Sequence, residues 1–231
     1  MDAESVDATL AACERALASS APPDLRAVGF WRAVAAVKRH PEWTDRFAER
    51  IAQIDRRAFL ARVRLVLPLP LGVALLLLGS AVGVVLLGAA FALEPMTAGI
   101  AALLGTGALI GATHDLAHLV VGRAVGIRFT HWYVDLPKRP QPGVKLDYAS
   151  YLRTSARSRA WMHVSGAVVT KLVPFAGALV ALAARVPWWA AASLVAIGVA
   201  QLVTDALFSV RAGDWKKFRR ELRIARATSG G

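Results

Sequence analysis

Long stretches without charged residues dominate the chain after residue 64. The first runs uninterrupted from Arg64 to Glu94, and three later stretches contain only isolated polar residues. A helix needs about 20 apolar residues to cross a bilayer, so each stretch is long enough for one span. The pattern predicts an all-α polytopic membrane protein with about four transmembrane helices, over residues 68–93, 96–122, 161–184 and 187–210.

Residues 1–64 have a different pattern, in which apolar residues recur at helical spacing between prolines. This predicts a small cytoplasmic helical module, which is either a docking or regulatory domain or an appendage on the membrane surface. The module is polar and mixed in charge, so we expect no cleavable signal peptide.

The loop over residues 127–158 carries β-favouring residues on either side of Pro137, Pro140, Pro142 and Gly143. Such a pattern predicts a β-hairpin at the cytoplasmic face, whose free edge is able to pair with an extended peptide. The alternative is an interfacial loop with aromatic anchors.

The distribution of basic residues predicts which side of the membrane each of these elements faces. They cluster before the first span, between the second and third, and in the tail at 211–231, whereas the short links at Glu94 and Arg185 carry few. By the positive-inside rule both termini and the long loop are cytoplasmic. The net charge of +12 therefore reflects topology and attraction to anionic lipids, and we expect no nucleic-acid partner because no nucleic-acid-binding pattern is present.

The amino-acid composition excludes some classes of protein and of metal site. With 56% hydrophobic residues and a mean hydropathy of +0.46, a soluble enzyme is excluded. Cys13 is the only cysteine, so the chain forms neither an internal disulfide nor a thiolate metal cluster. Any metal must bind His, Asp or Glu.

The candidate chemistry lies in the second span, where His114, Asp115 and His118 follow one another. Histidines at i and i+4 project from one face of a helix, so both imidazoles are able to bind one metal ion. Polar residues at that depth are costly and usually functional.

Depth along the spans points to a third ligand. His114 lies 18 residues after Met96, and Asp205 lies 18 residues after Pro187, each roughly 27 Å from the outer end of its span. The two spans run in the same direction, so His114, His118 and Asp205 are predicted to meet near the cytoplasmic edge. The alternative for Asp205 is an ion pair with Lys171, or a position facing the headgroups.

The order of these parts resembles the site-2 protease family. His-Asp-Leu-Ala-His at 114–118, followed by Val-Gly-Arg-Ala-Val-Gly-Ile at 121–127, is similar to the family's His-Glu-x-x-His helix and the turn after it. Ser-Gly-Ala at 165–167 resembles its small-residue motif, and Asp205 falls where a later span supplies its third ligand. The resemblance covers about residues 96–210.

The resemblance implies an intramembrane zinc metalloprotease that hydrolyses membrane-spanning protein or peptide substrates near the cytoplasmic face. Zn²⁺ would be held by His114, His118 and Asp205, with Asp115 as the catalytic base. Lys171 and His163 are accessory candidates: Lys171 either stabilises an oxyanion or pairs with Asp205, and His163 either acts in the site or is an interfacial histidine.

Two departures from the family pattern leave other functions open. Asp115 replaces the family's Glu and is one methylene shorter, and Asp205 lacks the preceding Asn-Pro and the following Gly. A zinc-binding membrane scaffold or regulator without catalysis is therefore the second hypothesis, and a small transporter using buried Asp and Lys is the third. Five histidines, only two of them suitably paired, are too few for a membrane diiron enzyme.

Overall fold

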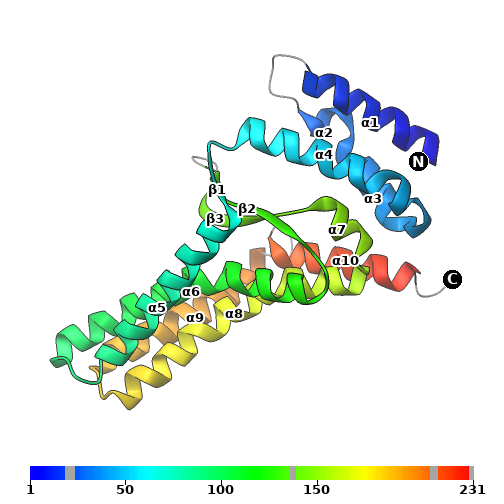
Figure 1. Cartoon of the computed structure of the whole chain (residues 1–231). Helices are drawn as coiled ribbons and strands as arrows, with labels where there is room; N and C mark the ends of the chain where they lie inside the picture. The colour runs from blue at the N-terminus through cyan, green and yellow to red at the C-terminus, as the bar shows by residue number, and fades with distance from the viewer. Residues whose placement is uncertain (19–23, 136–138, 209–212, 229–231) are drawn as a thin grey trace. The chain divides into compact units, whose positions relative to one another are not determined.

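The computed structural model describes residues 1–18, 24–135, 139–208 and 213–228 of the chain (Figure 1). Part of the predicted hairpin turn, at 136–138, and the ends of the predicted tail, at 211–212 and 229–231, lie outside these residues. The elements in chain order are α1 (Ala3–Ala18), α2 (Leu25–Val28), α3 (Phe30–Arg39), η1 (Pro41–Trp43), α4 (Thr44–Arg62), β1 (Leu65–Pro68), α5 (Leu69–Ala89), α6 (Pro95–Ala124), β2 (Phe129–Asp135), β3 (Arg139–Leu146), α7 (Tyr148–Arg153), α8 (Ala156–Ala183), α9 (Trp188–Phe208) and α10 (Asp214–Thr228).

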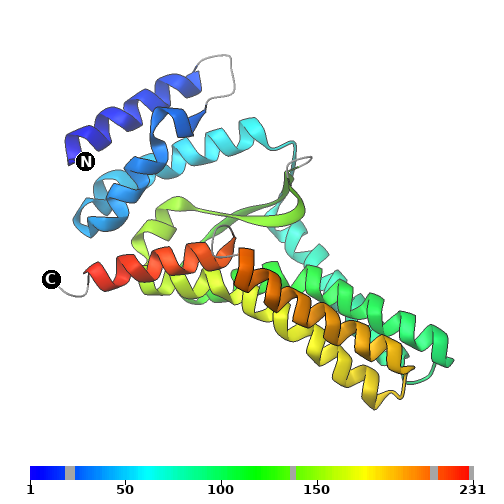
Figure 2. The same cartoon turned by 180° about the vertical axis from the view of Figure 1, so that it is seen from behind.

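Four of these helices, α5, α6, α8 and α9, are long and apolar enough to cross a membrane. At 1.5 Å per residue even the 21-residue α5 spans about 30 Å, the thickness of the hydrocarbon layer. The chain is thus a multi-pass membrane protein, and the prediction of four spans is confirmed. The helices lie side by side, and Figure 2 shows α9 beside α8 from behind.

Small residues hold this helical bundle together. Where α5 and α6 cross, a methyl group on Gly83 would come within 2.8 Å of the Gly105 carbonyl oxygen. A methyl group on Gly105 would come equally close to the Gly83 carbonyl oxygen. Such close approach of backbones is how transmembrane helices gain packing energy without a hydrophobic driving force. The outward-facing apolar side chains are exposed, as lipid contact requires, among them Leu78, Val85 and Leu179.

The first span ends at Ala89, four residues before the predicted end at 93, and the starts of the first and third spans also differ from the prediction. Residues 65–68 form β1, paired with β2, so the first span begins after them at Leu69. The third begins at Ala156, five residues before the predicted start at 161, and its first turn carries Arg157 and Arg159. Charge-free stretches mark only the hydrocarbon part of a helix, which continues into the headgroup region.

The chain divides into two compact units. One contains residues 70–121 and 160–219, and therefore most of the four spans. The other contains residues 1–69, 122–159 and 220–231, so the predicted N-terminal module shares its unit with the central loop. Its apolar core joins Phe30, Phe47 and Ile51 to Ala149 and Leu152 of α7.

The predicted hairpin is present as β2 and β3 in a three-stranded antiparallel sheet of order β1-β2-β3. Trp132 of β2 lies opposite Leu67 on one side and Val144 on the other. The strand β3 ends at Leu146, earlier than the β-favouring residues after it suggest. It ends there because Asp147 caps the helix α7: its side chain accepts a hydrogen bond from the Ser150 backbone N–H at 3.0 Å.

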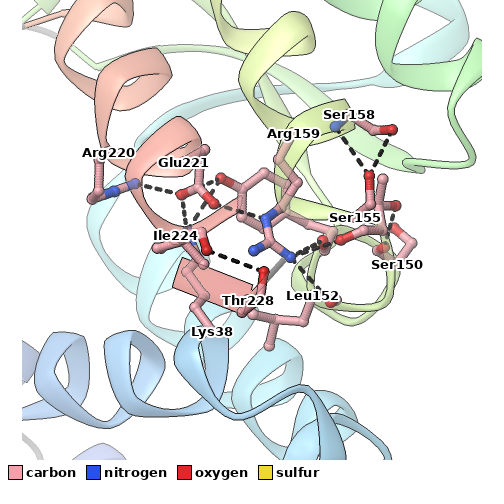
Figure 3. Close-up of polar contacts among 12 residues, drawn as sticks. Lys38, Ser150, Leu152, Ser155, Ser158, Arg159, Arg220, Glu221, Ile224 and Thr228 are labelled. Atoms are coloured by element: carbon pink, nitrogen blue, oxygen red, sulfur yellow. Dashed lines mark hydrogen bonds and ion pairs between the residues drawn. The ribbon is translucent and has the colours of Figure 1, made fainter. Parts of the chain in front are cut away.

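A buried ionic network lies in the same unit, around Glu221 of α10 (Figure 3). The fully buried Glu221 side chain accepts hydrogen bonds from Lys38 Nζ at 2.6 Å, Arg159 Nε at 2.8 Å and the Tyr151 hydroxyl at 3.1 Å. Burial lowers the pKa of Lys38 to about 8, against the opposing effect of the Glu221 charge. Burial works against ionisation of Glu221 too, but the charges of Lys38 and Arg159 outweigh it and lower the pKa to about 2. The carboxylate is therefore ionised at neutral pH.

Candidate metal centre

The helix α6 places His114 and His118 one turn apart on the same face, as the i, i+4 spacing predicts. Their ring centroids lie 4.8 Å apart. The His118 side chain is 10% exposed and that of His114 is 35% exposed, so His114 is the more accessible of the two.

The third member of the group is Asp214, the first residue of α10. Its Oδ2 lies 3.3 Å from His118 Nε2 and 3.5 Å from His114 Nε2. One ligand atom from each of the three residues lies within 4.8 Å of the others, so the group could hold a metal ion.

Hydrogen bonds at the opposite ring nitrogens fix how the two histidines face Asp214. His118 Nδ1 lies 2.7 Å from the carbonyl oxygen of Met162, which is only able to accept, so Nδ1 carries the proton. His114 Nδ1 lies 2.9 Å from the hydroxyl of Thr170, whose own proton is donated to the Gly166 carbonyl. In both neutral imidazoles the Nε2 lone pair is therefore directed at the site.

This arrangement requires positive charge between the three residues. Two Nε2 lone pairs and a carboxylate oxygen repel one another at the observed distances unless a cation or added protons lie among them. With both imidazoles protonated, their hydrogen bonds and the charge of Lys217 outweigh the burial of Asp214 and hold the pKa of its carboxyl well below its ordinary value. A metal ion would satisfy the same three atoms, and its ligating histidines are typically held through the other ring nitrogen as observed here.

The backbone of α8 packs directly against the His118 ring. A Cβ atom on Gly166 would come within 2.4 Å of His118 Nε2. Any other residue at this position would force the imidazole or the helix to shift, which gives the Ser-Gly-Ala motif at 165–167 a physical role.

Asp115 lies next to this group. It is 4% exposed, and its Oδ2 has no hydrogen-bond partner among the described residues. The carboxylate interacts electrostatically with His114, His118 and Asp214. A buried carboxylate oxygen without a partner is costly, and a catalytic role is one of the reasons for which such an atom is retained.

The other predicted site residues lie elsewhere. Asp205, predicted as the third ligand, instead forms an ion pair with Lys171 and accepts a hydrogen bond from Trp215 Nε1 at 2.8 Å. The pairing of Lys171 with Asp205 is the alternative that the sequence left open. His163 is buried on α8 and does not belong to the metal-binding group found among the described residues.

The sequence pattern missed Asp214 because it follows the last span, in a tail that the sequence analysis describes only by its basic residues. One signal was available. A lysine inside a span needs a counterion, and Asp205 is the only acidic residue of the fourth span. Pairing it with Lys171 leaves Asp214 as the next carboxylate along the chain.

Comparison with known proteins adds no assignment, since no family model, curated protein or solved structure matches the chain.

Proposed function

We propose that the chain is a zinc-dependent intramembrane metalloprotease of the site-2 protease type, with His114, His118 and Asp214 as the metal ligands. The observation that carries the proposal is the convergence of these three side chains beside the buried Asp115, whose Oδ2 has no hydrogen-bond partner among the described residues. Donor atoms bound to zinc at 2.0–2.1 Å with tetrahedral angles lie about 3.3 Å apart. The two Nε2–Oδ2 distances, 3.3 and 3.5 Å, fit that spacing.

A set of three protein ligands is typical of hydrolytic zinc sites. Zinc held by His114, His118 and Asp214 would supply a Lewis acid for the scissile carbonyl and would make water acidic enough to attack near neutral pH. Asp115 accepts the proton of the attacking water as the C–O bond forms. It then returns that proton to the amide nitrogen as the C–N bond breaks.

The substrate in this proposal is a membrane-spanning protein or peptide segment, cleaved near the cytoplasmic face. Both termini and the sheet lie on the cytoplasmic side, as the basic clusters predict. The sheet formed by β1, β2 and β3 offers strand edges on which an unwound segment could pair.

The test is cleavage of a reporter transmembrane segment by purified protein in liposomes. Asp115→Asn should keep its metal, since Asp115 is no ligand, and lose roughly 10² to 10⁴ in rate. Asp115→Glu restores the longer side chain of the family motif, and His114→Ala serves as the metal-free control. If the native protein and Asp115→Glu both bind zinc yet cleave nothing, the chain is a metal-binding membrane scaffold and the protease proposal is wrong.

A further inference from the structure

The segment that carries Asp214 is docked on the membrane unit by its own side chains. Trp215 donates its indole N–H to Asp205 of α9 at 2.8 Å. One turn later the Phe218 ring contacts Trp215 at 5.9 Å and Trp161 of α8 at 6.0 Å between centroids. All of these residues belong to one compact unit.

Asp205 is itself held in place by charge. Its carboxylate forms an ion pair with Lys171 of α8, whose side chain is 14% exposed. The residue before Lys171 is Thr170, which holds His114 through Nδ1. One turn of α8 therefore orients a metal-facing histidine and anchors the carboxylate that receives Trp215.

From this geometry we infer that Asp205 and Trp215 are positioning residues for the metal site: Asp205 fixes the indole of Trp215 and thereby places the adjacent Asp214 carboxylate against His114 and His118. The inference rests on the proposed metal-binding function and replaces the predicted role of Asp205 as a ligand. A third ligand that comes from outside the four spans has to be docked, and among the described residues the Asp205–Trp215 hydrogen bond is a specific polar contact that does so.

Zinc affinity, measured by competition with a chromophoric chelator in detergent, tests this inference. Trp215→Phe keeps the aromatic ring and removes the N–H donor, so it should weaken zinc binding by about ten- to a hundredfold, as loss of a ligand-supporting hydrogen bond does. Trp188→Phe, a change of the same kind at an 80% exposed tryptophan, should leave zinc affinity unchanged.

A second variant separates positioning from direct ligation. Lys171→Met combined with Asp205→Leu removes the ion pair without leaving a buried charge unpaired. Its zinc affinity should fall about as far as that of Trp215→Phe, and adding Trp215→Phe should cause no further loss, because both changes act through one contact. Measured without metal, the Trp215→Phe and Lys171→Met/Asp205→Leu variants should unfold at the same temperature as the Trp188→Phe control. Equal unfolding temperatures would show that the variants lose zinc affinity without losing the fold.

Two results would overturn the inference. Wild-type affinity in Trp215→Phe with loss of zinc in the Lys171→Met/Asp205→Leu variant would make Asp205 a ligand. Wild-type affinity in both variants would leave neither residue a role in the site. Absence of zinc binding in the wild-type chain would instead contradict the proposed function itself, so the two failures are distinguishable.

Discussion

Short contacts fix the positions of the two histidine rings in the candidate metal site. Gly166 is the clearest case, because any side chain there would occupy the space of His118 Nε2. The imidazole has little freedom to move away while its Nδ1 donates to the Met162 carbonyl at 2.7 Å. Gly166 therefore shapes the candidate metal site although it provides no ligand atom.

We predict that Gly166→Ala lowers zinc affinity at least tenfold by turning the His118 ring out of its position. Gly111→Ala is the matched control, since Gly111 lies on the ligand helix one turn before His114 and a Cβ there meets nothing within 4 Å. Titration of both variants with zinc gives the comparison. Equal affinities would mean that the ring adapts and that Gly166 is only a packing residue.

At this scale the sequence predicts two of the three residues in the candidate metal site, His114 and His118. The i, i+4 spacing of His114 and His118 is local, so helix geometry alone places both rings on one face. The position of the third residue, Asp214, depends on how the chain returns to the site after the fourth span. No local sequence pattern encodes this return. Depth counting selects Asp205, which the structure pairs with Lys171.

At the scale of elements, apolar length identifies the four spanning helices because the bilayer imposes it. The strand β1 could not be predicted in this way, since residues 65–68 resemble the start of a span until β2 is available to pair with them. Similarly, the β-favouring Tyr148 and Tyr151 lie in a helix, because the Asp147 side chain caps it.

The part of α10 that begins at Arg220 is fixed within its unit by the Glu221 network, in which two buried cations face one carboxylate. Removing Lys38 leaves Glu221 with Arg159 and Tyr151, whereas removing the Glu221 charge leaves two buried cations without a carboxylate. We therefore predict that Glu221→Gln destabilises the protein by about 3 to 5 kcal/mol, and that Lys38→Met costs clearly less.

Thermal unfolding in detergent would measure both effects, with Arg219→Gln on the exposed face of α10 as the control. If Lys38→Met proves as damaging as Glu221→Gln, the network depends on the lysine itself rather than on neutralising the carboxylate.

For the whole molecule, the orientation of the chain in the membrane determines which side the candidate site faces. The basic clusters predict that Ser155 and Lys216 are cytoplasmic and that Glu94, between α5 and α6, is on the opposite side. Single cysteines at these three exposed positions are suited to labelling with an impermeant maleimide, because the native Cys13 is fully buried. Labelling of Ser155→Cys or Lys216→Cys from the outer side would reverse the topology and move the site to the other face.

The central claim is that His114, His118 and Asp214 hold one zinc ion, and metal analysis of the purified chain tests it most directly. After brief exposure to a weak chelator, the wild-type protein should retain one zinc per chain, and Asp214→Ala should retain little or none. Full zinc in Asp214→Ala, or none in the wild-type chain, would contradict the account.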